Sequence, residues 1–377
     1  MASVDPSPTQ LPDRAVVAVD LFCGIGGLTH GLLKAGVKVV AGYDLDASCR
    51  YAYEANNEGA VFHHADVTTL TAADLRKHYP EGAVRVLVGC APCQPFSSLK
   101  RTSRAEDVQS GASPRTDLDD PAWAPLRHFG QLIEDLSPDV VSMENVTRLA
   151  NRKKYPVYDE FIGRLERAGY LVTEYRPYGP DFGIPQRRRR LVVFASKHGS
   201  VNLVRPGKKP APEDVSVARS LSVLPKLEHG QSDPNDRVHV VRRLTETNLK
   251  RVEASRPGGT WEDWPEALRL ECHKKATGTS FASVYGRMDP EAPAPTITTQ
   301  FFNVGTGRFV HPEQNRGLSL REGAILQTFP REYAFVEDGK PLSIQGLGRH
   351  IGNAVPPVLG RVIGRSILNH VTQMPLF

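Results

Sequence analysis

The sequence predicts an α/β protein that has a doubly wound main domain and a second, smaller irregular domain. Three observations lead to this fold class. Over the first 150 residues, short β-branched runs alternate with helical stretches, which is typical of a parallel sheet covered by helices on both faces. The chain has 377 residues, whereas a single core stops growing at about 250–300 residues. Finally, the alternation is lost over residues 197–285 and returns after them.

The elements of the main domain follow one another in chain order. Residues 15–21, A-V-V-A-V-D-L, form a buried-strand pattern, and the helical spacing after them predicts a helix that ends at Gly36. Residues 97–125 are rich in Ser, Arg, Asp and Pro and predict a long loop, functional or disordered. Further strands are expected at residues 37–43, 84–89 and 140–143 and directly after Arg190, and further helices at residues 47–57 and 357–371, the last packing back on the main domain.

The composition excludes several classes of protein. Hydrophobic residues make up 40% of the chain and charged residues 24%, so a core can form and global disorder is not expected. No run of roughly 18 apolar residues occurs, which argues against a membrane span. Residues 1–13 lack the pattern of a signal peptide and are expected to be a flexible tail. Five cysteines form no disulfide framework, and their odd number favours free thiols in the cytoplasm.

The net charge of +5 is unevenly distributed. Residues 1–186 carry a net −5, residues 187–287 a net +9 and residues 288–377 a net +1. The positive stretch begins with four consecutive arginines at residues 187–190. Such a segment favours contact with a polyanion, although a solvated face of a globular domain remains the structural alternative.

The segment D-L-F-C-G-I-G-G, residues 20–27, is the first candidate binding site, because glycines at a strand-to-helix junction let a ligand approach the backbone. Asp44 ends the next predicted strand, where a carboxylate can bind ribose hydroxyls. Asp66 follows another apolar stretch and can read an exocyclic amine. Thr29 replaces the third glycine of the dinucleotide fingerprint, so the pattern favours S-adenosylmethionine over NAD. A plain tight turn, with Asp44 capping the next helix, is the alternative.

Residues 84–97, V-R-V-L-V-G-C-A-P-C-Q-P-F-S, place two thiols at C-x-x-C spacing after a strand. A zinc site needs a second cysteine pair, which the remaining three cysteines do not form. A dithiol redox site has its second cysteine at the start of a helix, which Pro95 disfavours. The third interpretation is a single nucleophile, Cys93, whose backbone is held on either side by Pro92 and Pro95.

Glu144, in S-M-E-N-V, is the third candidate, at the end of an apolar strand. Parallel sheets bind ligands at the carboxyl edge of their strands. Near apolar walls a carboxyl group can hold a proton at neutral pH and act as a general acid. The structural alternative is a carboxylate at the start of a helix.

Taken together, these motifs resemble the DNA (cytosine-5) methyltransferases. Residues 20–27 resemble the family's cofactor motif, G-C-A-P-C-Q-P-F-S its catalytic loop, and E-N-V its second catalytic motif. Q-R-R-R-R, residues 186–190, resembles the family's Q-x-R-x-R. G-R-M-D-P-E-A-P-A-P-T-I-T-T and I-G-N-A-V-P-P, residues 351–357, complete the pattern. Each motif is modest evidence, but six in the right order are highly specific. The resemblance implies a Rossmann-like, doubly wound mixed sheet of the class I methyltransferase type.

The resemblance implies a covalent mechanism. Cys93 would add to carbon 6 of a target cytosine, and carbon 5 would then take the methyl group of S-adenosylmethionine before proton and thiol leave. Glu144 would contact ring nitrogen 3 and the exocyclic amine. Arg188 and Arg190 would bind near the cytosine carbonyl and the adjoining backbone, with Arg190 as the expected base contact. The cytosine must be flipped out of the duplex, and the loop of residues 97–125 would close over it.

The resemblance also assigns domains and ligand contacts. Residues 14–196 and 286–377 would form the S-adenosylmethionine-binding catalytic domain, and residues 197–285 the target-recognition domain. Asp44 and Leu45 depart from the commoner Glu and aromatic residue. The expected cofactor-binding residues are Leu21, Phe22, Gly24, Gly26, Gly27, Asp44, Leu45, Asp66, Pro92 and Asn353. The expected DNA-binding residues are Gln94, Ser97, Arg237, Arg242, Arg243, Lys250, Arg251 and Thr298.

The expected partner is duplex DNA, bound within a short specific sequence by a monomer in the bacterial cytoplasm. No metal and no membrane are expected, and a cognate restriction endonuclease would form no stable complex with the chain. Trp261 and Trp264 are expected in the core of the small domain. Three alternatives stay open: a transfer-RNA cytosine-5 methyltransferase of the same fold, a catalytically silent DNA-binding homologue, and a dithiol oxidoreductase.

Overall fold

The computed structural model of the protein describes residues 14–92, 121–271, 273 and 283–374. The chain forms two compact units. Unit 1 comprises Met1–Pro177, Arg189–Gly207 and Leu359–Phe377, and unit 2 comprises Tyr178–Arg188 and Lys208–Val358. Within the described residues, no helix has both the length and the apolar composition that a membrane crossing requires.

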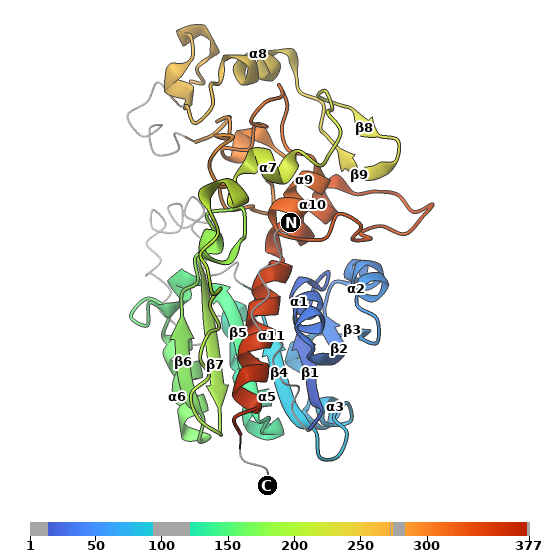
Figure 1. Ribbon diagram of the computed structural model, residues 1–377, viewed down its shortest axis with the longest axis vertical. Helices are drawn as coiled ribbons and strands as arrows, with labels where there is room; N and C mark the ends of the chain where they lie inside the picture. Colours follow the sequence, from blue (N-terminus) through green and yellow to red (C-terminus); the bar gives the residue numbers. More distant parts are fainter. Residues whose placement is uncertain (1–13, 93–120, 272, 274–282, 375–377) are drawn as a thin grey trace. The chain divides into compact units, whose positions relative to one another are not determined.

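A seven-stranded mixed sheet forms the centre of unit 1, with strand order β3-β2-β1-β4-β5-β7-β6 (Figure 1). The strands β3, β2, β1, β4 and β5 are parallel to one another, and β7 is antiparallel to both β5 and β6. The predicted doubly wound mixed sheet is therefore confirmed. The strands are β1 (Val16–Leu21), β2 (Lys38–Asp44), β3 (Val61–His64), β4 (Val84–Gly89), β5 (Val140–Val146), β6 (Leu171–Tyr175) and β7 (Arg190–Ser196).

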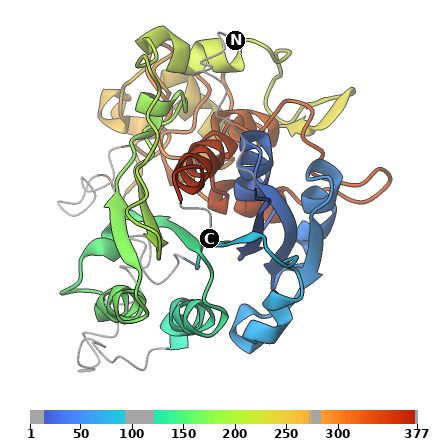
Figure 2. The ribbon, with the colours of Figure 1, turned by 60° about the horizontal axis from the view of Figure 1, so that its bottom comes forward.

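Helices cover both faces of this sheet, and Figure 2 shows α5 and α6 on one face and α1 and α11 on the other. On the first face, Leu21 of β1, Phe129 of α5 and Phe161 of α6 belong to one buried apolar cluster. On the second face, a Cβ at Gly360 would lie 2.8 Å from the Leu28 carbonyl oxygen, so α11 closely approaches α1. The helices of unit 1 are α1 (Gly27–Ala35), α2 (Arg50–Asn56), α3 (Ala72–Arg76), α5 (Ala124–Leu136), α6 (Pro156–Arg167) and α11 (Pro357–Val371, from Leu359 onward).

The predicted strands and helices form in unit 1, and two predicted segments differ in extent, whereas β3, β6, α3, α5 and α6 were not predicted. The strand predicted at residues 140–143 continues to Val146, because Glu144, Asn145 and Val146 pair with β7. Residues 121–125, predicted as the end of a long loop, already form a 3₁₀ turn and the start of α5, where proline occupies the first turn. Residues 97–120 of that predicted loop lie outside the described residues.

Short helices and irregular segments make up unit 2. Its elements are α7 (Val217–Leu221), β8 (Ser232–Asp233), β9 (Asp236–Val240), α8 (Glu246–Ala254), α9 (Leu320–Leu326) and α10 (Ile344–Asn353). Trp261 and Trp264 are each 3% exposed, and Trp264 Nε1 donates to Ser255 Oγ at 2.9 Å. Their expected core position is confirmed.

A buried ion pair lies at the N-terminus of α9 in unit 2. Arg316 is 0% exposed and Glu322 is 1% exposed. The Arg316 guanidinium donates to both Glu322 oxygens, at 2.8 and 2.6 Å. Glu322 also accepts the Ser319 amide at the N-terminus of α9, at 2.7 Å. Burial acts to raise the pKa of Glu322, but the hydrogen bonds and charge of Arg316 hold it below its ordinary value.

The boundaries of unit 2 differ from the predicted division at residues 197 and 286. Arg287 shows the physical reason, because its buried guanidinium donates to the carbonyls of Val252 and Ser255 before it in the chain and of His311 and Gln314 after it. Residues on both sides of position 286 therefore pack into the same unit.

Candidate active site

The loop between β1 and α1 has three residues in the left-handed backbone conformation and leaves open space at Gly24. Phe22 has a φ of 59°, a left-handed conformation that costs energy for a residue with a side chain, and Gly24 and Gly26 have φ values of 51° and 85°. A Cβ at Gly24 would meet no atom within 4 Å, so space lies open above it. The Phe22 ring packs edge-on against Phe129, with the ring centroids 6.3 Å apart. The glycines of this motif are thus required by the turn itself.

Asp44 ties this loop to the end of β2. Its Oδ2 accepts the Gly24 amide at 2.8 Å, and its Oδ1 accepts the Asp46 amide at 2.9 Å. Capping of the next 3₁₀ turn belongs to Asp46, whose carboxylate accepts the Ser48 amide. The predicted alternative role of Asp44, as that cap, is therefore filled by its neighbour.

Asp66 and Leu45 lie at the surface of unit 1. Asp66 Oδ1 accepts both the amide and the hydroxyl of Thr68, at 2.9 and 2.7 Å, and these hydrogen bonds lower the pKa of Asp66. Its Oδ2 takes part in none of these hydrogen bonds. Leu45 is 65% exposed, and its predicted role at the cofactor stays a prediction.

Asp20 lies in β1 just before the β1–α1 loop and is buried, at 1% exposure. The Thr29 hydroxyl donates to Oδ2 at 2.7 Å, whereas Oδ1 has no hydrogen-bond partner among the described residues. Burial raises the pKa of Asp20 to about 7, although the Thr29 hydrogen bond acts in the opposite direction. Burial, with the charges of Asp20 and Asp44, also raises the pKa of Cys23 well above its usual value. Cys23 is thus a thiol, not a nucleophile.

Replacement of Asp20 by asparagine is expected to change the pH dependence of stability. The carboxyl has an ordinary pKa of 3.8 and a folded pKa of about 7, so the folded state binds more protons between these values. The free energy of unfolding of the wild type therefore falls as the pH rises through this window. The stability of Asp20→Asn relative to the wild type should rise from near zero at pH 4 to roughly 2–4 kcal/mol at pH 8.

Urea unfolding at both pH values measures this difference. Asp135→Asn, which removes an exposed carboxylate of α5, serves as the control. An Asp20→Asn effect of equal size at pH 4 and pH 8 would show that the carboxyl does not titrate in this window.

Glu144 lies in β5 at 3% exposure, with two neighbours from adjoining strands. Cys90, directly after β4, donates its Sγ proton to Glu144 Oε2 at 3.0 Å. Arg190, the first residue of β7, places Nε 3.1 Å from Glu144 Oε1. This ion pair lacks hydrogen-bond geometry, so Oε1 has no hydrogen-bond partner among the described residues. The site therefore holds a fixed carboxylate with one buried oxygen still able to bond.

The start of the predicted catalytic loop is attached to β5 beside Glu144. Asn145 is 1% exposed, and its Nδ2 donates to the Ala91 carbonyl at 3.1 Å. The next residue, Pro92, is exposed. Cys93, Gln94 and Ser97 lie outside the described residues, so their predicted roles stay predictions.

In unit 2, Gln186 and Arg188 of the arginine-rich motif belong to a second local arrangement. Arg188 is 4% exposed and donates to the carbonyls of Ile297 and Ala354, at 3.2 and 3.1 Å. Gln186 accepts the Ile297 amide at 3.1 Å. A Cβ at Gly352 would lie 2.4 Å from the Thr298 backbone. Three motifs that are distant in sequence thus meet around residues 297–298.

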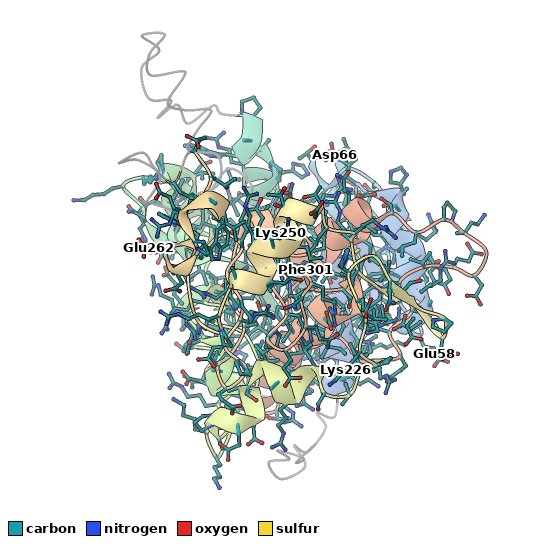
Figure 3. All side chains as sticks on the ribbon, turned by 90° about the horizontal axis from the view of Figure 1, so that it is seen from above. Glu58, Asp66, Lys226, Lys250, Glu262 and Phe301 are labelled. Carbon is teal, nitrogen blue, oxygen red and sulfur yellow. The ribbon has the colours of Figure 1, made fainter. Side chains whose placement is uncertain are left out.

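The predicted ligand contacts of unit 2 differ in exposure. Asn353 is exposed at the end of α10, and Thr298 is partly buried. Arg242, Arg243 and Lys250 are exposed; Lys250 lies on α8 (Figure 3), where it pairs with Glu246 at 2.9 Å.

Two other predicted DNA contacts are engaged within unit 2. Arg251 donates to the Leu268 carbonyl at 2.9 Å, and Arg237 donates to the carbonyls of Glu337 and Lys340. These hydrogen bonds hold both guanidinium groups against neighbouring backbone. The predicted role of both arginines in DNA binding stays a prediction.

The sequence analysis did not assign site roles to three residues of these arrangements: Cys90, Asn145 and Gln186. Cys90 was considered only in the zinc and dithiol interpretations of C-x-x-C and was predicted to be dispensable for methyl transfer, and Asn145 was considered only as part of E-N-V. Cys90 follows β4, and Glu144 and Asn145 lie near the end of β5. Because successive parallel strands bring their carboxyl ends to one edge of a sheet, the sequence could have indicated that Cys90 lies close to Glu144 and Asn145.

The chain is similar to known DNA methylases. The family model of C-5 cytosine-specific DNA methylases matches residues 16–369. The type II methylase M.HgiDII of Herpetosiphon aurantiacus is 45% identical, over 93% of this chain and 94% of its own length. The type II methyltransferase M1.HphI of Haemophilus parahaemolyticus is 30% identical, over 94% of this chain and 87% of its own length.

Solved structures share the fold. A prophage protein of E. coli described as a DNA modification methyltransferase superimposes with a TM-score of 0.67 at 19% identity, over 95% of this chain and 100% of its own. The Dnmt2 methyltransferase of S. pombe gives a TM-score of 0.56 at 18% identity, over 94% and 97%. With the family model matching nearly the whole chain, the protein belongs to the C-5 cytosine-specific DNA methylases and is a DNA (cytosine-5) methyltransferase.

Proposed function

We propose that this enzyme transfers a methyl group from S-adenosylmethionine to carbon 5 of a flipped-out cytosine in a short specific sequence of duplex DNA. The observation that supports this most directly is the environment of Glu144. Its carboxylate is 3% exposed, is held by Cys90 and Arg190, and keeps one buried oxygen without a hydrogen-bond partner among the described residues. Such an oxygen matches a ligand that brings its own donor or acceptor.

The residues of the β1–α1 loop fit a nucleoside cofactor that carries a positive charge. The backbone is open above Gly24, and Asp44 holds this loop from β2. Asp20 in β1 has an oxygen that finds no hydrogen-bond partner in the described part of the chain, and residues 1–186 carry a net negative charge. Phe22, Gly24, Gly26, Asp44 and Asp66 would hold S-adenosylmethionine, which supplies the methyl group when bound.

The reaction is proposed to begin with addition of the Cys93 thiolate to carbon 6 of the cytosine. Carbon 5 then becomes a nucleophile and gains the methyl group. Loss of the carbon-5 proton to a base re-forms the double bond as the thiolate leaves carbon 6, which gives 5-methylcytosine. Glu144 donates a proton to ring nitrogen 3 as negative charge develops on the ring, which leaves its carboxylate ionised, and it takes a proton back from this nitrogen when the thiolate leaves.

Arg190 is proposed to act on both partners of this step. Its Nε lies 3.1 Å from Glu144 Oε1, so its charge stabilises the carboxylate after proton transfer. Its side chain is 14% exposed and is proposed to contact the cytosine carbonyl. Because carbon 6 cannot be reached in a stacked duplex, the cytosine must leave the helix.

Covalent trapping tests this proposal. Duplex DNA containing 5-fluorocytosine in the target sequence is expected to form a stable adduct with the wild-type enzyme when S-adenosylmethionine is present, because fluorine at carbon 5 blocks the final elimination. Bisulfite sequencing of DNA from cells that express the chain supplies the target sequence. The adduct should be visible as a shifted band in a denaturing gel.

The variant Cys93→Ala should form no adduct, whereas Cys90→Ser should still form it. Absence of an adduct with the wild type would contradict the proposed chemistry and favour a silent DNA-binding homologue. Methylation of transfer RNA in preference to duplex DNA, in a competition assay, would instead favour the RNA alternative.

A further inference from the structure

The thiol of Cys90 contacts the carboxylate that the proposed function places in the reaction. Cys90 Sγ lies 3.0 Å from Glu144 Oε2, while the other oxygen, Oε1, faces Arg190 and has no hydrogen-bond partner among the described residues. The two oxygens of Glu144 are therefore differently occupied. We propose that Cys90 is a positioning residue, which fixes the rotation of the Glu144 carboxyl group so that Oε1 faces the substrate.

A glutamate needs such an anchor because its last torsion is soft. Rotation about the bond between an sp³ carbon and a carboxylate has broad minima, so burial alone does not determine which oxygen faces the substrate. The ion pair with Arg190 lacks hydrogen-bond geometry and restricts this rotation weakly. The Cys90 thiol, donating along one direction to an acceptor that carries charge, restricts it further.

The backbone that carries Cys90 is itself held on both sides. The Cys90 amide donates to the Leu21 carbonyl at 3.3 Å, which attaches it to the end of β1. Asn145 Nδ2 donates to the Ala91 carbonyl at 3.1 Å, which attaches the next residue to β5. Gly89 before it pairs with both β1 and β5. The donor thus stands on a rigid support, as positioning requires.

The contact also distinguishes the two cysteines of C-x-x-C. The thiol proton of Cys90 is used in a hydrogen bond to Glu144, so Cys90 is most useful as a neutral donor. A serine hydroxyl can donate in the same way, whereas an alanine cannot. Because this inference rests on the proposed role of Glu144, its test must separate the two ideas.

Single-turnover adduct formation with 5-fluorocytosine DNA provides that test. Cys90→Ala is expected to slow the rate of adduct formation by about five- to tenfold, the value of one hydrogen bond, with the KM for DNA and for S-adenosylmethionine unchanged. Cys90→Ser should restore the rate to within about threefold of the wild type. The matched control is Cys49→Ala, which removes a buried thiol of unit 1 just before α2.

A second background shows whether Cys90 acts through Glu144. In Glu144→Ala, the further change Cys90→Ala should have no effect on the residual rate, because a double-mutant cycle isolates the coupling between the pair. An equal slowing in both backgrounds, a Cys90→Ala rate equal to that of the wild type, or a loss of adduct yield without a change in rate would each overturn the positioning role. Failure of the wild type to form any adduct would overturn the proposed function itself.

Discussion

Replacing Glu144 by glutamine is expected to slow methyl transfer by about 10²–10⁴-fold, the usual contribution of a general acid. Glutamine keeps the size and shape of the side chain and can still accept the Cys90 hydrogen bond, but its amide cannot give a proton to the ring. Binding of DNA should change little, because the loss concerns charge that develops during the reaction. Single-turnover transfer of labelled methyl groups at saturating DNA and cofactor measures the effect.

Glu174→Gln is the matched control, because it makes the same change on β6 of the same sheet, in a surface cluster with Arg152 and Arg176. Its rate should equal that of the wild type. A Glu144→Gln rate within fivefold of the wild type would mean that Glu144 serves only to hold the strand ends together and transfers no proton.

Replacing Glu322 by glutamine is expected to destabilise unit 2 by about 3–5 kcal/mol, the usual effect of breaking a buried ion pair. The substitution leaves the charge of Arg316 without compensation at 0% exposure. It also weakens the start of α9, where the carboxylate accepts the Ser319 amide. Urea unfolding followed by tryptophan fluorescence is a suitable measurement, because Trp261 and Trp264 both lie in this unit.

A double replacement sharpens this test. Arg316→Met combined with Glu322→Leu removes both charges and should cost less than Glu322→Gln alone, because apolar groups of similar volume need no compensation. Glu134→Gln, which breaks a surface pair with Arg164, should cost at most about 1 kcal/mol. If Glu322→Gln is no more destabilising than Glu134→Gln, the buried pair contributes little to the stability of the unit.

Much of the fold was predictable because local patterns determine it. The strand at residues 84–89 and the helix at residues 357–371 have the predicted bounds, and Gly36 ends α1 with a φ of 100°, as its residue type indicates. The extension of β5 to Val146 was missed, because it depends on antiparallel pairing with β7, some 45 residues later in the chain. Pairing between distant strands leaves no mark in a local pattern.

The site was predictable in its residue types and less so in its contacts. Asp44 at the end of β2 accepts the Gly24 amide, so two positions that the sequence singled out lie together, while their role toward a cofactor stays a prediction. The hydrogen bond between Cys90 and Glu144 was missed, because a C-x-x-C motif suggests a partner within the motif. The contact of Arg251 was also missed. Its position in a positive stretch suggested contact with DNA, whereas its guanidinium donates to the Leu268 carbonyl of its own unit.

The close packing of α11 on α1 has a consequence for the course of folding. Gly360 faces Leu28, and Gly364 faces Leu32 and Ala35, so the contact joins segments that are some 330 residues apart in the chain. Contacts of such high sequence separation form slowly. The face of α1 that α11 covers is therefore exposed during folding until α11 has packed on it, which makes this face a place where non-native association can begin.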